Sequence, residues 1–175
     1  KNTTLDDFIN ALGKASNRDL TQWSQEWLYQ TGLNTIKVDF QCDAGKVTQM
    51  SLLQTAPEDY PTIREQRVQI GLYNITDDKL TATKSIPVLY KGEKFVIDDA
   101  VGSICPDLVY PNQDDWGYVK VDLDDKSFET LTQHINDINN TTLRLMLWQS
   151  LWDSVNDAKL SLDKFVNFAI NNIGQ

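Results

Sequence analysis

The spacing of apolar residues changes twice along this chain, and no other feature restricts the possible folds more. Near the start, Leu5, Phe8 and Leu12 lie three or four residues apart, which is typical of one face of a helix. From 36 to 42, apolar and polar residues alternate, which is typical of a strand with one buried face. After Asp124 the helical spacing returns. The sequence therefore predicts helices, then a sheet, then helices again.

The first segment predicts a pair of helices. Thr4 followed by Asp7 resembles a capping box at the start of the first helix, and Gly13 is a plausible end for it. The second helix should begin after Asp19, an acidic N-cap that the helix dipole favours. Gly32 fits the left-handed position that ends many helices.

The middle of the chain predicts six or seven short strands with a turn about every ten residues. No helical spacing interrupts them, which favours an antiparallel, immunoglobulin-like β-sandwich. The expected strands are 36–42, 46–54, 68–72, 80–90, 95–97, 108–110 and 119–123.

The last segment predicts about three helices, the third of them capped by Ser161. The second helix also carries Leu145 and Met146 away from its main apolar stripe, and a helix that is apolar nearly all round needs neighbours on several sides. The chain begins with Lys1 rather than Met, so we expect an excised piece with a truncated helical domain. The expected fold class is α+β with a mainly β core. The expected domains are 1–33, 34–123 and 124–175.

Four of the five tryptophans fall on the apolar stripes of predicted helices. A buried aromatic ring removes a large apolar area from water, so we expect these rings to pack between domains rather than to stack on sugars. The residues are Trp23, Trp27, Trp148 and Trp152. The fifth, Trp116, follows two aspartates in a predicted loop, where exposure is plausible.

The charge of the chain argues against two classes of partner. Sixteen Lys and Arg against 25 Asp and Glu give a net charge of −9, and no cluster of basic residues is present. Binding to nucleic acid or to an anionic membrane surface normally needs a cationic face. No apolar run approaches the roughly 18 residues that span a bilayer. We therefore expect no nucleic-acid partner and no membrane insertion.

The residues that ligate metals are too few for a conventional site. A zinc site of the HExxH kind needs two histidines, and the chain has only His134, which we expect on the surface of a helix. Cys42 and Cys105 are too far apart in sequence for a CxxC pair. They can bond to each other only if folding brings their Cα atoms within about 7 Å, which the sequence leaves open. We expect no catalytic, cofactor-binding or metal-binding residue in the chain itself.

Pairs of adjacent aspartates recur, and paired carboxylates can perform acid–base chemistry or hold calcium. None has the spacing of a calcium-binding loop, and all fall where turns or helix caps are expected, so we interpret them as turn residues. The pairs are 77–78, 98–99, 114–115 and 124–125. The residues alone therefore indicate a non-catalytic sandwich between helices. The alternative is an independent β-sandwich module that binds carbohydrate or protein.

Four strings of the sequence resemble segments of zinc aminopeptidases of the aminopeptidase N family, and they occur in the same order as in that family. The strings are LTQWSQEWLYQTGLNTIKV at 20–38, REQRVQIGLYN at 64–74, PNQDDWGYVKVDLD at 111–124 and LRLMLWQSLWDSVNDAKLSLDKFV at 143–166. Together they extend over nearly the whole chain.

The resemblance implies the end of a catalytic domain, a β-sandwich domain, and the first helices of a C-terminal helical domain. Family members remove amino acids from the N-terminus of peptides, with a zinc ion held by HExxH and a distant Glu. Those residues precede the resembling region, so no catalytic role is carried onto this chain. The resemblance implies a structural portion whose partners are the other domains of the parent enzyme, which would hold the zinc and meet the peptide substrates. It leaves the compartment open, with the cytoplasm slightly favoured and the bacterial envelope as the alternative.

Overall fold

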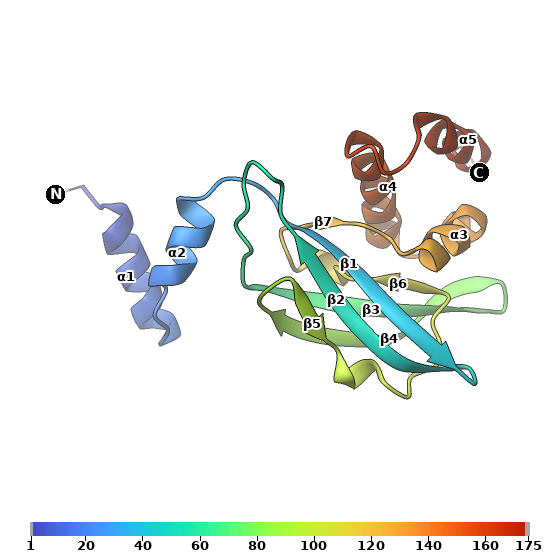
Figure 1. Cartoon of the computed structure of the whole chain (residues 1–175), viewed down its shortest axis with the longest axis horizontal. Helices are drawn as coiled ribbons and strands as arrows, with labels where there is room; N and C mark the ends of the chain where they lie inside the picture. The colour runs from blue at the N-terminus through green and yellow to red at the C-terminus, as the bar shows by residue number, and fades with distance from the viewer. Residues whose placement is uncertain (1, 174–175) are drawn as a thin grey trace.

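The computed structural model describes residues 2–173 and has the predicted α+β architecture. A helix pair precedes two packed sheets, and three α-helices follow them (Figure 1). The α-helices are α1 (Leu5–Ser16), α2 (Thr21–Leu28), α3 (Asp125–His134), α4 (Thr141–Asn156) and α5 (Leu162–Asn172). The strands are β1 (Thr35–Asp43), β2 (Lys46–Thr55), β3 (Gln66–Thr76), β4 (Lys79–Tyr90), β5 (Lys94–Val96), β6 (Leu108–Tyr110) and β7 (Lys120–Val121). Three short 3₁₀ turns are η1 (Asp98–Ala100), η2 (Gln113–Asp115) and η3 (Ile135–Asp137).

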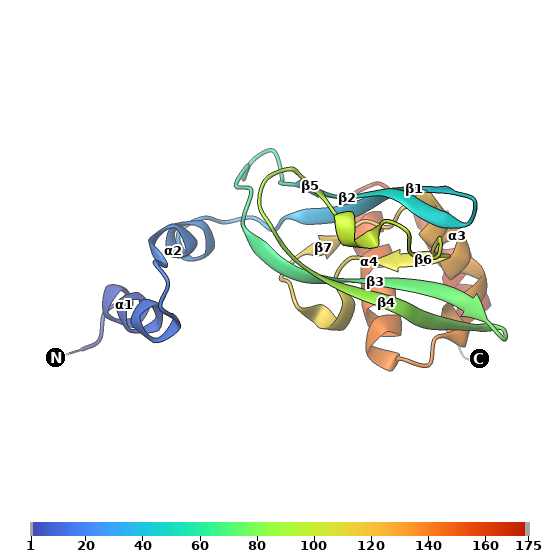
Figure 2. The same ribbon diagram turned by 90° about the horizontal axis from the view of Figure 1, so that it is seen from below.

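The strands form two sheets that face each other, which confirms the predicted sandwich (Figure 2). Sheet A has the order β5-β2-β1-β7, and sheet B has the order β4-β3-β6. Neighbouring strands are antiparallel except at β1 and β7, where Thr35 pairs with Lys120 in parallel. No hairpin constrains this pair, because most of the sandwich lies between the two strands in sequence.

The alternating pattern decides which side chains enter the core. Ile36 and Val38 of β1 point inward and are almost fully buried. The same is true of Val68, Ile70 and Leu72 of β3. These residues pack in one continuous apolar cluster that also includes residues of α3 and α4. The period-2 spacing of the sequence therefore reports the buried face correctly.

The ends of the first two helices differ from the prediction. The Thr4–Asp7 capping box is present, and hydrogen bonds from the Thr4 backbone N–H and hydroxyl lower the pKa of Asp7. Gly13 does not end α1, because the helix continues to Ser16 and is capped by Asn17, which adopts the left-handed conformation that asparagine tolerates. The predicted end of the second helix at Gly32 is also wrong, because α2 ends at Leu28. Gly32 does have a positive φ of 93°, but there the chain passes Tyr60 so closely that a Cβ would lie 2.6 Å from the Cβ of Tyr60.

The caps of the later helices follow the prediction more closely. Asp19 accepts a hydrogen bond from the Thr21 N–H at the start of α2, although Leu20 occupies the N-cap position. Ser161 caps α5 as expected, and Asp124 caps α3. Helix α3 ends at His134, and the turn η3 follows it directly. Ile138, which follows this turn, is buried in the core.

All four aspartate pairs lie in turns or caps, as interpreted from the sequence. Asp77 and Asp78 form the turn between β3 and β4 and both have positive φ. The pairs at 98–99 and 114–115 lie in η1 and η2, and Asp124 and Asp125 begin α3.

The structure answers the question that the sequence left open about the two cysteines. Cys42 and Cys105 form a disulfide, with their Cα atoms 5.9 Å apart. Among residues 2–173, no helix has both the length and the apolar character needed to cross a membrane.

Candidate interdomain junctions

The loop between β2 and β3 places a buried arginine against the end of α2. Arg64 is only 3% exposed. Its Nε donates to the carbonyl oxygen of Glu26 at 2.8 Å, and its Nη2 donates to the carbonyls of Gln30 and Thr31 at 3.1 Å each. Within the described chain, no carboxylate forms an ion pair with Arg64. The guanidinium therefore uses its donors on the backbone where α2 leads into β1.

Three buried amide side chains tie the same arginine to the sandwich. The Asn34 Oδ1 accepts from Arg64 Nη1 at 3.4 Å and from Gln66 Nε2 at 3.4 Å. The Gln54 Nε2 donates to the carbonyl of Arg64 at 3.1 Å and to that of Gly92 at 3.0 Å. We call this set, with the end of α2, the Arg64 junction: Asn34, Gln54, Arg64 and Gln66. It connects α2 with β1, β2 and β3.

Of the two tryptophans of α2, Trp27 lies at this junction. The Arg64 guanidinium carbon is 5.4 Å from the centre of the half-buried Trp27 ring. The Trp27 indole nitrogen is buried and has no hydrogen-bond partner in the described chain. A cavity of about 400 Å³ lies beside it, lined in part by Gly32 and Tyr118. Trp23 is 38% exposed.

Helix α1 presents an apolar face that the described chain does not cover. It has no buried residue, and Leu5, Phe8 and Leu12 are 40%, 53% and 39% exposed. Figure 1 shows α1 and α2 extending away from the sandwich. A helix with a regular apolar stripe and no buried side chain normally has a packing partner.

A second set of contacts, which we call the helical seam, joins β6 and β7 to α3 and α4. Tyr110 of β6 is buried, and its hydroxyl lies 3.3 Å from the Ser150 Oγ of α4. Burial raises the pKa of Tyr110 to about 12, although the hydrogen bond with Ser150 acts in the opposite direction. Tyr73 and Tyr90 also have pKa values raised by burial.

Ser127 links α3 to the sheet within the same seam. This residue is fully buried, and its Oγ accepts from the Val109 N–H of β6 at 2.8 Å. The Ser127 Oγ also donates to the Asp124 carboxylate, which caps the helix. The Ser127 hydroxyl thereby hydrogen-bonds both a backbone N–H of β6 and the capping residue of α3.

Two ion pairs extend the seam to the turn between α4 and α5. Lys120 Nζ lies 2.7 Å from Asp157 Oδ1, and Lys159 Nζ lies 2.9 Å from Asp122 Oδ2. The two pairs have opposite polarity, because the strand contributes the lysine to one and its continuation contributes the aspartate to the other. Such crossed pairs favour one orientation of the helices on the sheet.

The remaining predicted tryptophans contact α5. The Trp148 ring lies 4.7 Å from the Phe168 ring, and the Trp152 ring lies 5.4 Å from the Phe165 ring, between centroids. Trp148 is half-buried and Trp152 is 44% exposed. The outer face of α5 stays uncovered, since Val166 and Ile170 are 43% and 71% exposed.

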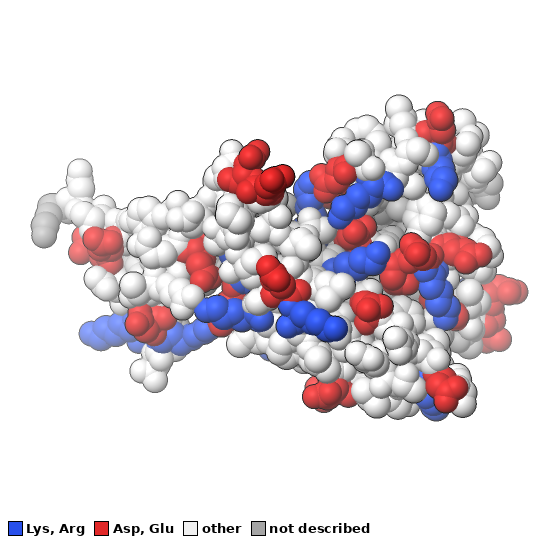
Figure 3. Space-filling view, viewed as in Figure 1, with Lys and Arg blue, Asp and Glu red and all other residues white. Residues whose placement is uncertain are grey.

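The His, Cys, Asp and Glu side chains of the described residues do not gather into a metal-binding cluster. Among residues 2–173, no group of three or more His, Cys, Asp or Glu is placed to hold a metal ion. His134 is half-buried and its Nδ1 lies 2.8 Å from Asp137 Oδ2, so the ring pairs within its own turn. Acidic and basic side chains are mixed on the face in Figure 3, with no broad basic region.

The sequence indicates the burial of some residues of the Arg64 junction but not of others. Gln54 continues the inward phase of Met50 and Leu52, and Gln66 continues that of Val68, so period-2 counting would have placed both amides inside. Arg64 has no such signal, because it lies in a polar loop that reads as solvent-exposed.

Comparison with known proteins relates these elements to a longer chain. Residues 108–173 match the ERAP1-like C-terminal domain family, so the match begins in β6 and extends over α3, α4 and α5. The chain is also 32% identical to Aminopeptidase N from Streptomyces lividans over 182 residues, which cover 99% of this chain and 21% of the relative. The chain thus spans about a fifth of the length of that curated relative.

Proposed function

This chain belongs to the aminopeptidase N family and corresponds to a C-terminal part of such an enzyme, and on that premise we propose that it is a non-catalytic structural portion of a zinc-dependent aminopeptidase. The parent enzyme removes N-terminal amino acids from peptides. Residues 1–33 are the helical end of its catalytic domain, 34–123 its sandwich domain, and 124–175 the first helices of its helical domain. The sandwich spaces the two helical parts and docks both.

The observation that carries the docking role is the Arg64 junction. Arginine is rarely buried without a carboxylate, because moving a charge out of water is costly. Here the guanidinium is buried against the carbonyl end of α2, where the helix dipole places negative partial charge. That arrangement fixes the direction in which α2 leaves the sandwich.

Zinc does not fit the residues of this chain. The one histidine is paired with Asp137, and the two cysteines are bonded to each other. A zinc site needs three or four nitrogen, sulfur or carboxylate ligands around one point. We therefore assign the zinc and the peptide-binding groups to other parts of the parent, which are the partners of this chain.

The four tryptophans support the same role to different degrees. Trp27 lies at the Arg64 junction, Trp23 is 38% exposed on α2, and Trp152 is 44% exposed beside Phe165 of α5. Trp148 packs largely on Phe168 and Phe165 within this chain. We propose that Trp23, Trp27 and Trp152 contact neighbouring domains and that Trp148 holds α5 in place for such contacts.

An activity assay tests the non-catalytic role. The purified 175-residue chain, supplied with zinc, should not hydrolyse alanyl-p-nitroanilide, whereas the full-length parent should hydrolyse it with one zinc per molecule. Stoichiometric zinc in the short chain together with turnover would contradict the proposal. Saturable binding of an oligosaccharide by the short chain would instead favour the alternative, an independent binding module.

Limited proteolysis of the parent tests the docking role. The Arg64→Met variant should be cut between α2 and β1 about tenfold faster than the wild type, because local opening of that segment becomes easier. Arg67→Met is a matched control, since Arg67 is exposed and stacks on Trp116 at 5.2 Å. Equal cleavage rates in all three proteins would refute the docking role of Arg64.

A further inference from the structure

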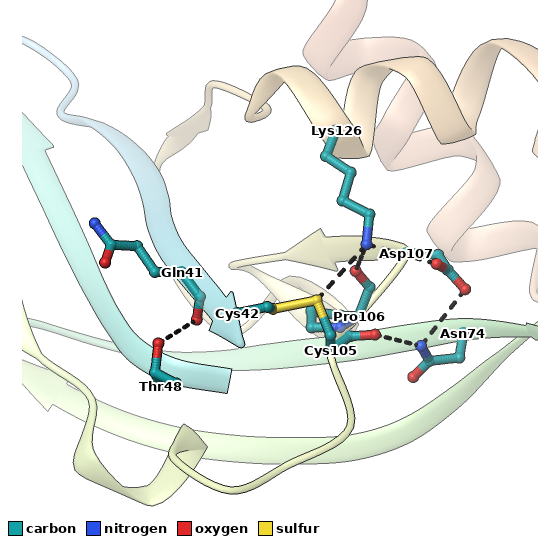
Figure 4. Close-up of a disulfide and its surroundings, with 8 residues drawn as sticks. All are labelled: Gln41, Cys42, Thr48, Asn74, Cys105, Pro106, Asp107 and Lys126. Atoms are coloured by element: carbon teal, nitrogen blue, oxygen red, sulfur yellow. Dashed lines mark hydrogen bonds and ion pairs between the residues drawn. A yellow bond between two sulfur atoms is a disulfide. The ribbon is translucent and has the colours of Figure 1, made fainter. Parts of the chain in front are cut away.

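The disulfide joins the two sheets at the end of the sandwich far from α2. Cys42 is in the last part of β1, and Cys105 lies just before β6 (Figure 4). The Cys105 N–H donates to the Gly45 carbonyl at 2.9 Å, and the Cys105 carbonyl accepts from Asn74 Nδ2 of β3 at 2.8 Å. Cys105 is therefore attached to the β1–β2 hairpin on one side and to sheet B on the other.

The two sulfur atoms have different surroundings. Cys42 is exposed, whereas Cys105 is half-buried. The Lys126 Nζ of α3 lies 3.8 Å from the Cys105 Sγ, and Figure 4 shows the lysine side chain reaching down to that sulfur. The same ammonium donates to the Pro106 carbonyl at 2.6 Å and pairs with Asp107 Oδ1 at 3.6 Å, which holds it in place.

Both cysteines and Lys126 line one depression of about 610 Å³, so a small molecule in solvent can approach the disulfide. Asp39, Asp124 and Asp125 also line it, which leaves Lys126 and Lys37 as its cationic groups. The rate of thiol–disulfide exchange depends on access to the attacked sulfur and on how readily the other sulfur leaves as a thiolate. A nearby ammonium stabilises a thiolate.

We propose that Cys42–Cys105 is a thiol-exchange site, at which an external thiolate attacks Cys42 and Cys105 departs as a thiolate beside Lys126. The S–S bond breaks, a new bond forms between the external sulfur and Cys42 Sγ, and the electron pair of the broken bond goes to Cys105 Sγ. When the reductant is a dithiol, its second thiolate attacks the reductant sulfur that is bonded to Cys42. Cys42 then departs as a thiolate, and the reductant is released as a disulfide. The chain gains two electrons and two protons, and the dithiol loses them.

Reduction removes the covalent link but not the backbone contacts around it. The Val47 N–H still donates to the Ser103 carbonyl at 2.9 Å, and the Gly102 N–H to the Val47 carbonyl at 2.8 Å. The reduced chain should therefore stay folded with a looser end of the sandwich. This property belongs to the chain itself and does not depend on the proposed aminopeptidase role.

The direction of attack is tested by trapping the mixed disulfide. The native 175-residue chain is treated briefly with 2-mercaptoethanol, quenched with acid, alkylated with N-ethylmaleimide and mapped by mass spectrometry. We expect the 2-mercaptoethanol adduct on Cys42 and the maleimide on Cys105, at a ratio of at least about ten to one. An even distribution, a preference for Cys105, or two free thiols in the chain purified without reductant would overturn the proposal.

The role of Lys126 is tested by the rate of reduction with dithiothreitol. Lys126→Gln should slow the reduction by roughly threefold to tenfold, and Lys126→Arg should restore most of the rate. Lys46→Gln changes an exposed lysine on the β1–β2 hairpin that carries Cys42 and should leave the rate unchanged. Urea unfolding of each oxidised variant separates a change in exchange chemistry from a change in stability. Equal rates in Lys126→Gln and the wild type at equal stability would contradict the role of the lysine.

Discussion

At the scale of single residues, Arg64 shows how a buried charge can determine the direction of a helix. Hydrogen bonds in which one partner is ionised contribute about 1.5–3 kcal/mol each, compared with about 1 kcal/mol for a neutral pair. Arg64 directs three of them to carbonyl groups at and after the end of α2. Lysine lacks the planar fork that makes these bonds together, so Arg64→Lys is not a conservative change.

Tyr110 contributes to the sensitivity of the folded chain to alkaline pH, as do Tyr73 and Tyr90. An unfolded tyrosine loses its proton near pH 10, whereas Tyr110 in the folded chain keeps its proton up to about pH 12. Ionisation therefore favours the unfolded chain between these values. The free energy of unfolding should fall by up to about 1.4 kcal/mol per pH unit from this residue as the pH rises above 10.

Urea unfolding at pH 9 and pH 11 measures the effect. Between these two conditions, Tyr110→Phe should lose roughly 1 kcal/mol less stability than the wild type. Tyr118→Phe is the control, because Tyr118 is 73% exposed and should behave as the wild type does. The interpretation of Tyr110 would be wrong if the two variants lost the same amount.

Sequence reasoning at this scale identified the packing residues better than the polar ones. Ile36 and Val38 could be assigned to the core because alternation is imposed by the strand geometry. Arg64 could not, because its partners are the carbonyl groups of α2 and of the segment after it, which lie far away in the sequence. The pairing of Cys42 with Cys105 likewise depended on the arrangement of both sheets.

At the scale of elements, the Ser127 hydroxyl makes a buried hydrogen bond between α3 and β6. Ser127→Ala leaves the buried Val109 N–H without an acceptor, which costs about 1–3 kcal/mol, and removes a contact of the capping Asp124. The expected loss of unfolding free energy is roughly 2–3 kcal/mol. Ser161→Ala at the exposed cap of α5 should cost only about 1 kcal/mol.

Chemical unfolding of the two serine variants at neutral pH makes the comparison. Both changes remove a hydroxyl near a helix start, so a larger loss in Ser127→Ala isolates the contact with β6. Equal losses in the two variants would mean that Val109 finds another acceptor and that Ser127 acts only through the cap.

The types of the elements followed from the sequence, whereas several of their ends did not. The caps at Thr4 and Ser161 were identified because the capping residue acts on its own backbone neighbours. The helix ends predicted at Gly13 and Gly32 are wrong, because glycine permits a helix end without requiring one. α2 ends at Leu28, before Gly32, and Arg64 binds the Glu26 carbonyl in its last turn, a contact that the local sequence does not indicate.

At the scale of the whole molecule, the sandwich lies between two helical parts whose outer faces are apolar. The uncovered faces are on α1, at Leu5, Phe8 and Leu12, and on α5, at Val166 and Ile170. Exposed apolar faces of this kind mark contacts with other protein surfaces.

Hydrogen–deuterium exchange tests the central claim that this chain is a scaffold docked on both sides in a longer enzyme. Amide exchange is compared between the 175-residue chain and the full-length parent. The amides of α1 and α5 should exchange at least about tenfold more slowly in the parent, whereas those of β3 in the sandwich core should exchange equally in both. Equal exchange of α1 and α5 in the two proteins would contradict the claim.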